Sequence, residues 1–305
     1  MEYTKEGIEK EFFKFVYKRQ LIWHKRFVLK EKAPWTNDDV LKTYKIINVY
    51  RELDKCTLYI IDKLKGIKDR EKLILNVIFY RFFNKFNLYE KLGIEPFDKI
   101  DDFLRDKLIS SFDRIKQDDR AIFNNAYLIS SGEKGQKKHV SIINNLGHLN
   151  LNELIRDIDN SKSPRESLEI IQTIPMVGPF LACEIWTDLT YFKFFKQKWN
   201  DNDFVNIGPG AKLGLEIMYH FKLGKKEQEA RLDYLYQIQG DCLKDIHKEL
   251  GEALEWKDIA FKGAFSNYPF LSITNVEGSL CEFRKYWNIK HGRGKRRYFK
   301  AFSNN

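Results

Sequence analysis

Cysteine is scarce and widely dispersed in this chain. Only four cysteines occur among 305 residues, at Cys56, Cys183, Cys242 and Cys281. No CxxC pair is present, which excludes the common zinc sites and the four-cysteine iron–sulfur clusters. Single, separated cysteines in a basic chain indicate buried thiols of an intracellular, cytoplasmic protein. The six histidines also lack metal-ligand spacing, and we therefore expect no metal and no cofactor.

Long apolar runs and a signal peptide are missing as well. No run approaches the roughly 18 apolar residues of a membrane span, and the charged start MEYTKEGIEKE has no secretory pattern. We therefore expect no membrane partner, and no obligate protein partner is evident. The chain does have a bulky composition, with 43% hydrophobic and 15% aromatic residues. This content is enough to bury one large core or two smaller ones.

Helical periodicity dominates the sequence. Apolar residues recur at helical intervals through most of the chain, as in the N-terminal run that begins at Ile8 and Phe12. Alternation typical of a strand is best seen at Phe270–Val276. The predicted fold class is therefore all-α, with two lobes.

The segment Gln172–Ile185, QTIPMVGPFLACEI, predicts two helices joined by a tight turn. Gly178 interrupts an apolar helical run, and Pro179 suits the first position of the second helix. Unpaired N–H groups at such a helix start can hold a DNA phosphate. The pattern resembles the Leu-Pro-Gly-Val-Gly hairpin of helix-hairpin-helix DNA-binding proteins, with Met176 in place of the first glycine. An ordinary Gly-Pro break between two core helices is the alternative.

Two carboxylates, Asp201 and Asp203, follow in the segment Trp199–Leu215. In helix-hairpin-helix DNA glycosylases, the helix after the hairpin is introduced by a catalytic Asp and often ends in Leu-Gly-Leu. This resemblance places Asp203 on the catalytic position, with Asp201 as a second candidate. Gly208-Pro209-Gly210 departs from the pattern, because it would break the helix midway. The alternative is a turn-forming loop in which Asp or Asn caps a helix.

The resemblance to these enzymes implies a two-lobed, helical, helix-hairpin-helix DNA glycosylase-like fold. Residues 1–305 are then one domain, divided into an N-terminal lobe at 1–129, a helix-hairpin-helix lobe at 140–225, and C-terminal helices with a basic tail at 226–305.

Positive charge is in excess. The chain has 53 Lys plus Arg against 43 Asp plus Glu, a formal net charge of +10, which attracts polyanions. The excess is concentrated in Lys290–Lys300, KHGRGKRRYFK, and a solvated tail is the alternative to a DNA contact there. The predicted partner is double-stranded DNA with modified bases. Besides the hairpin, the candidate DNA-binding residues are Lys212, Arg293, Lys295, Arg296 and Arg297.

Several motifs far apart in the chain resemble one family signature. They are Pro34-Trp35-Thr36, Asn48–Asp54, Tyr80–Asn84, Ala126-Tyr127, Gly208–Ala211 and Glu277–Tyr286. Together they resemble the helical domain found with hydroxymethyl-deoxyuridine DNA kinases, which is grouped with alpha-glutamyl/putrescinyl thymine pyrophosphorylase-like proteins. The resemblance implies a relative of the helix-hairpin-helix glycosylases that handles hypermodified pyrimidines in DNA. The chain has no GxxxxGK(S/T) phosphate loop, so we do not expect it to be the kinase itself.

The same signature contains charged residues on otherwise apolar helices. They are Arg51, Asp54, Arg81, Glu282 and Lys285. The functional interpretation is a base pocket, in which an arginine holds the phosphate or the modification of a flipped nucleotide. The alternative is ion pairing within the core, as Arg81–Asp54, Arg51–Glu282 or Glu282–Lys285.

Three functions fit these patterns. The first is a monofunctional DNA glycosylase that flips and excises a hypermodified pyrimidine from phage DNA, leaves an abasic site and serves anti-phage defence. Phe180 stands where strand-cutting glycosylases carry a lysine, so water would be the nucleophile. The second is a transferase that installs a hypermodification on pyrophosphorylated hydroxymethyluracil, with Lys212, Arg51 or Arg81 near the leaving group. The third is a non-catalytic reader of modified DNA.

Overall fold

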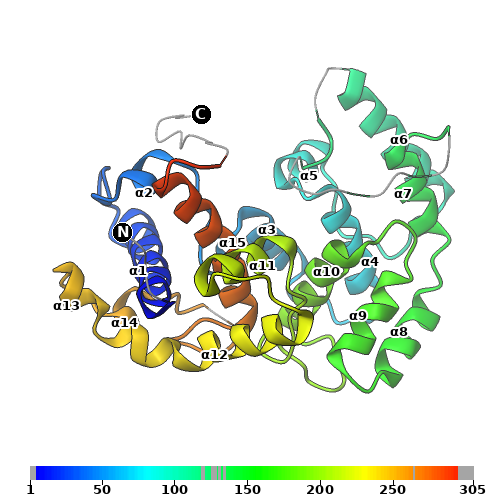
Figure 1. Ribbon diagram of the computed structural model, residues 1–305. Coiled ribbons are helices and arrows are strands. Elements are labelled where there is room, and N and C mark those ends of the chain that lie inside the picture. Colours follow the sequence, from blue (N-terminus) through cyan, green and yellow to red (C-terminus); the bar gives the residue numbers. More distant parts are fainter. Residues whose placement is uncertain are drawn as a thin grey trace. The chain divides into compact units, whose positions relative to one another are not determined.

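Helices make up the regular structure of this computed structural model (Figure 1). The structure describes residues 5–117, 121–124, 129, 132, 135–263 and 265–294. No strand occurs among those residues, and the predicted all-α class is confirmed. The strand candidate Phe270–Val276 was wrong, because a helix begins inside it. The Ser272 side chain accepts a hydrogen bond from the backbone N–H of Asn275 and so caps that helix.

The chain forms two compact units. Unit 1 combines Met1–Asp54 with Ile207–Asn305, and unit 2 is the continuous stretch Lys55–Asn206. The units cut across the predicted parts, since residues 1–129 are divided after Asp54 and residues 140–225 before Ile207. Periodicity shows where helices are, whereas this division depends on which distant helices pack together.

Unit 1 brings the two ends of the chain into one core. The ring of Phe12 lies 5.4 Å from that of Phe283, and Phe15 lies 5.0 Å from Tyr286, between ring centroids. The elements of unit 1 are α1 (Lys5–Trp23), the π-helical turn η1 (His24–Val28), α2 (Asp39–Thr43), the 3-10 turn η2 (Arg51–Leu53), α11 (Pro209–Tyr219), α12 (Lys225–Lys244), α13 (Ile246–Leu250), α14 (Trp256–Ile259) and α15 (Ile273–Lys290).

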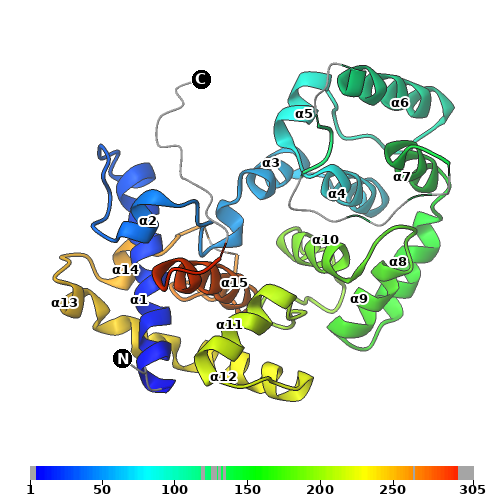
Figure 2. The same ribbon diagram turned by 45° about the horizontal axis from the view of Figure 1, so that its top comes forward.

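Helices α11 and α15 lie side by side in both views (Figures 1 and 2). Two glycines of α11, one turn apart, allow this close approach. A Cβ atom on Gly214 would lie 2.6 Å from the backbone oxygen of Leu280, and one on Gly210 would overlap the Sγ of Cys281. The Gly-Pro-Gly segment does not break a helix; it starts one. Gly208 precedes Pro209 at the first helical position, and its N–H donates to Glu277 (2.8 Å).

Unit 2 is built around α4, in which every residue from Leu73 to Phe83 is buried. A helix that is apolar all round belongs at the centre of a core, and α4 contacts α3, α7, α8 and α10 (Figure 2). The elements of unit 2 are α3 (Lys55–Leu64), α4 (Arg70–Phe83), α5 (Phe86–Leu92), α6 (Asp102–Gln117), α7 (Lys138–Gly147), α8 (Leu151–Asn160), α9 (Pro164–Gln172) and α10 (Pro179–Tyr191).

The length and hydropathy of the described helices decide whether one of them could span a membrane. In the part of the chain that the structure describes, none is both long and apolar enough to cross a bilayer.

Candidate nucleic-acid interface

The predicted hairpin has the expected local form. Helix α9 ends at Gln172 and α10 begins at Pro179, with Gly178 as its N-terminal cap. Met176 takes a left-handed backbone conformation (φ +67°), which is the conformation that a glycine at this place would supply. A Cβ atom on Gly178 would meet nothing within 4 Å. The turn is therefore tight despite the methionine, and the start of α10 is open in front of Gly178.

The two predicted catalytic carboxylates lie in one turn of unit 2. Asp203 is exposed, and its carboxylate accepts a hydrogen bond from the backbone N–H of Asn200 (2.7 Å). The N–H of Asp203 in turn donates to the oxygen of Asn200 (3.0 Å), so this carboxylate closes its own turn. Asp201 is buried, with 1% of its surface exposed. The helix after the turn begins at Pro209, in the other unit.

Arg81 lies on α4 with 1% of its surface exposed, and its contacts are within the core of unit 2. Its Nε and Nη2 donate to the two carboxylate oxygens of Asp188 on α10, with Nη2–Oδ1 at 2.8 Å. Nη2 also donates to Thr57 (2.8 Å) and Nη1 to Asn84 (3.0 Å). With every nitrogen on a protein acceptor, this guanidinium is held in place as a structural group. Asp188 was not predicted as a site residue, although a carboxylate within the apolar run of α10 was a signal that could have found it.

The other predicted base-pocket residues belong to unit 1. Glu282 is buried, accepts from the N–H of Ile47 (3.0 Å) and pairs with Lys285, as one alternative predicted. The N–H of Arg51 donates to Asn275 (2.8 Å). These contacts fasten the segment before α3 to α15. Arg81 is in unit 2, so the five predicted residues are divided between the two units. Asp54 ends the 3-10 turn η2.

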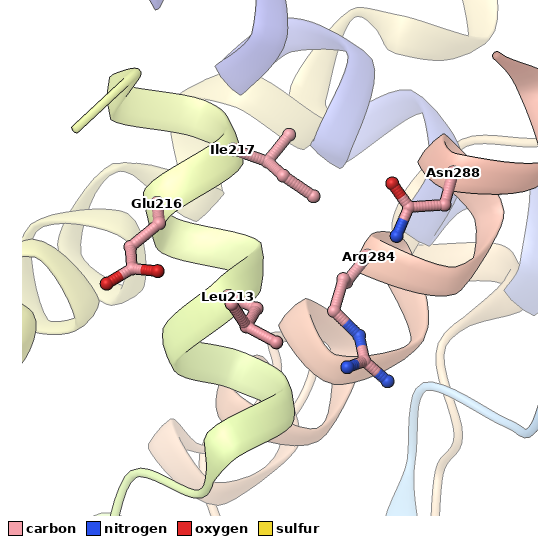
Figure 3. A pocket seen from close by; sticks show the side chains of 5 residues that line it. All are labelled: Leu213, Glu216, Ile217, Arg284 and Asn288. Carbon is pink, nitrogen blue, oxygen red and sulfur yellow. The ribbon is translucent and has the colours of Figure 1, made fainter. Parts of the chain in front are cut away.

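A groove between α11 and α15 offers a different set of side chains (Figure 3). Its first part, the Arg284 hollow, has a volume of about 360 Å³. Arg284 and Asn288 line it from α15, one turn apart, and the amide of Asn288 faces Ile217 of α11. The Nε of Arg284 is buried, and no described residue accepts a hydrogen bond from it. The hollow is lined by Leu213, Glu216, Ile217, Arg284 and Asn288.

The groove continues into a second part, the Trp287 hollow, of about 490 Å³. The two hollows share Glu216, Ile217 and Asn288, and both volumes lie within the roughly 300–1,000 Å³ of ligand sites. The Trp287 ring lies 4.3 Å from that of His291, between centroids. The second hollow is lined by Ile8, Glu216, Ile217, His220, Phe221, Lys222, Trp287, Asn288, His291 and Arg293.

The charge of the groove is positive. Arg284, Lys222 and Arg293 line it, and no carboxylate of the described residues forms an ion pair with them. Its one acidic residue, Glu216, lies 3.8 Å from Lys212 on the next turn of α11. Lysine and arginine next to aromatic rings form the usual binding surface for a nucleic-acid strand. Of the predicted DNA-binding residues, Arg293 therefore lines the groove and Lys212 stands beside it.

Three residues of the predicted basic tail, Lys295, Arg296 and Arg297, lie outside the described residues, as does the Ala126-Tyr127 motif. Arg284, Lys222 and Trp287 were not predicted as site residues. Arg284 lies inside the Glu277–Tyr286 signature, which is the signal that could have found it. Which face of α15 meets α11 is a matter of packing, and the sequence alone does not show it.

Comparison with known proteins identifies the family. The family model described as "5-hmdU DNA kinase, helical domain" matches residues 6–296. A "5-hmdU DNA kinase" of Bacillus phage SP10 is 28% identical over 297 residues, which cover 91% of this chain and 44% of the relative. The chain thus spans less than half of the length of that relative. No solved structure matches, so the helix-hairpin-helix glycosylase superfamily stays a prediction, whereas the kinase-associated family is confirmed.

The comparisons contradict the predicted enzyme. A glycosylase hydrolyses an N-glycosidic bond, but the matched family and relative are named for a DNA kinase, which transfers a phosphoryl group. The prediction of a monofunctional DNA glycosylase that excises a base, leaves an abasic site and acts in anti-phage defence is therefore wrong. The catalytic role predicted for Asp203 or Asp201 was tied to base excision, and it stays an untested prediction. The transferase and DNA-reader alternatives agree better with the family, and so does a DNA partner.

Proposed function

This chain belongs to the 5-hmdU DNA kinase helical-domain family, and we propose that it binds the DNA substrate for such a kinase. It would hold a strand that contains 5-hydroxymethyl-deoxyuridine while a phosphoryl group is transferred to the hydroxymethyl oxygen. The observation that carries the proposal is the basic, aromatic groove between α11 and α15. Both helices contain parts of the family signature, since Gly208–Ala211 starts α11 and Glu277–Tyr286 lies in α15.

The side chains of the groove indicate which of the two kinase substrates this chain binds. A DNA kinase must bind a phosphoryl donor and a DNA acceptor. The sequence of this chain holds no GxxxxGK(S/T) loop with which to cradle a nucleoside triphosphate. Its groove instead combines aromatic side chains with Arg284, Lys222 and Arg293, which form no ion pair within the part of the chain that the structure describes, and this suits an extended DNA strand. We therefore assign DNA binding to this helical part, and the donor site to another part of the kinase system.

A binding assay tests this proposal directly. Fluorescence anisotropy would compare labelled DNA containing 5-hydroxymethyl-deoxyuridine with the same sequence containing thymidine. Both should bind at low salt. The slope of log affinity against log salt should be negative, by about 0.7 to 0.9 for each phosphate that the protein contacts. One hydrogen bond to the hydroxymethyl group should favour the modified DNA by about 5- to 10-fold. Absence of binding to either DNA at low salt would remove the proposed function.

The hairpin before α10 is proposed as a second, sequence-independent DNA contact. Gly178→Leu should weaken binding by a similar factor for every DNA sequence, because phosphate contacts carry no base information. The variant should fold normally, since the glycine φ is −85° and its Cβ would meet nothing within 4 Å. Thermal melting provides the control for folding, and anisotropy with two unrelated sequences provides the readout. A loss confined to one sequence, or no loss at all, would contradict a phosphate contact here.

A further inference from the structure

We infer that the α11–α15 groove takes a single strand of DNA, with a backbone phosphate on Arg284 and a neighbouring unpaired base in the Trp287 hollow. This inference rests on the proposed function, and it specifies the form of the DNA and the side chain that positions it. The elements involved all belong to unit 1.

The contrast between two arginines identifies the phosphate position. All three guanidinium nitrogens of Arg81 donate to protein acceptors. Arg284 has no carboxylate partner among the described residues, and its buried Nε has no acceptor there either. Buried donors in proteins nearly always have a partner, and a guanidinium matches the oxygens of a phosphate as a planar fork. In Figure 3 the side chain of Arg284 runs downward along α15, and its terminal nitrogens point away from Ile217 and Asn288.

Asn288 completes the phosphate position. It follows Arg284 by four residues on α15, so the two side chains lie on the same face of the helix. In Figure 3 its amide also faces the gap between the helices, on the side of Ile217. An amide N–H one helical turn from a guanidinium adds a neutral donor for a second phosphate oxygen. Glu216 does not cancel this field, because Lys212 lies 3.8 Å from it and the N–H of Leu223 donates to it (3.4 Å).

The second hollow decides between single-stranded and duplex DNA. Trp287 lines it together with Phe221, of which 50% is exposed. In a duplex the faces of the bases are covered by their neighbours, so an aromatic side chain in a hollow can stack only on an unpaired base. Lys222 and Arg293 lie in the same hollow and supply cations for the next phosphates of the strand.

The test uses the full chain and labelled oligonucleotides about ten nucleotides long, as a single strand and as the matching duplex. Single-stranded DNA should bind more tightly than the duplex. Arg284→Ala should weaken single-strand binding about tenfold and lower the slope of log affinity against log salt by about 0.7. Arg156→Ala is the matched control, because this exposed arginine on α8 of unit 2 carries the same charge.

The outcomes separate this inference from the proposed function. Equal losses in Arg284→Ala and Arg156→Ala would mean that only net charge matters, and the Arg284 position would be wrong. Tighter binding of the duplex by the wild-type chain would overturn the single-strand inference while DNA binding itself stood. Failure to bind any DNA would remove both. Circular dichroism checks the fold of Arg284→Ala, and Arg284→Gln, which keeps polar volume, repeats the test if alanine does not fold.

Discussion

Asp188→Asn is expected to lower the free energy of unfolding by about 3 kcal/mol, toward the low end of the roughly 3–5 kcal/mol typical of a broken buried ion pair. The substitution keeps the shape of the side chain but leaves the charge of Arg81 buried with one carboxylate fewer. Both partners have 1% of their side-chain surface exposed, so water cannot take over. Glu184 lies 3.7 Å from Arg81. Because this second carboxylate stays next to the guanidinium, we expect the loss of unfolding free energy to be at the lower end of that range. Urea denaturation followed by circular dichroism measures the change.

A surface pair supplies the control for this substitution. Asp157 on α8 lies 3.2 Å from Arg156, and their side chains are 46% and 63% exposed. Asp157→Asn removes the same charge from the same unit but should cost only about 0–1 kcal/mol, because water screens exposed pairs. Similar losses in the two variants would show that the Arg81–Asp188 pair is not the structural centre of unit 2.

The base-pocket hypothesis for Arg81 makes a different prediction. If Arg81 held the modified base, Arg81→Lys would weaken binding of 5-hydroxymethyl-deoxyuridine DNA while unfolding stayed unchanged. Lysine cannot reproduce the forked contact with both oxygens of Asp188, so the structural role predicts a loss of stability instead. The two measurements on one variant therefore decide between these roles.

The sequence was informative wherever structure is decided locally. Helical periodicity gave the all-α class, and Pro179 was correctly expected at the first position of its helix. The turn around Asp203 matches the turn-forming alternative, because Asx side chains bond to backbone groups a few residues away. Each of these features depends on residues within one or two turns of one another.

Features that depend on distant packing could not be predicted. Arg81 and Asp188 are 107 positions apart, and the sequence suggested Asp54 as a partner because it shares the family signature. The discontinuous unit 1 joins residues before 55 with residues after 206. Periodicity did not indicate the groove, and the Glu277–Tyr286 signature that contains Arg284 did not show it either, since Arg284 and Trp287 become a site only when α15 packs against α11.

The close packing of α11 against α15 predicts a large loss of stability when Gly214 is replaced. Gly214→Val is expected to lower the free energy of unfolding by about 3 kcal/mol, the upper part of the range for overpacked sites. A Cβ atom there would lie 2.6 Å from the backbone oxygen of Leu280, and a backbone cannot move aside as a flexible side chain can. Gly214→Ala should show the same sign with a smaller loss, although alanine favours helix formation by about 1 kcal/mol over glycine.

Gly278 is the matched control on the partner helix. It lies within α15, and a Cβ atom on it would meet nothing within 4 Å. Gly278→Ala should therefore raise the free energy of unfolding by up to about 1 kcal/mol, through helix propensity alone. Two mid-helix glycines exchanged for the same residue are thus predicted to change stability in opposite directions. Equal signs would mean that α11 and α15 do not approach as closely as the structure shows.

The same pair of variants links packing to DNA binding. Forcing α11 away from α15 at Gly214 would widen the groove and separate Arg284 from the α11 side chains opposite it. Among molecules of Gly214→Ala that remain folded, affinity for single-stranded DNA should fall about 3- to 10-fold, the effect expected when a positioned contact is lost. Gly278→Ala should bind like the wild type. Anisotropy at a temperature where both variants are folded measures this, and unchanged binding by Gly214→Ala would show that the strand does not depend on the spacing of these helices.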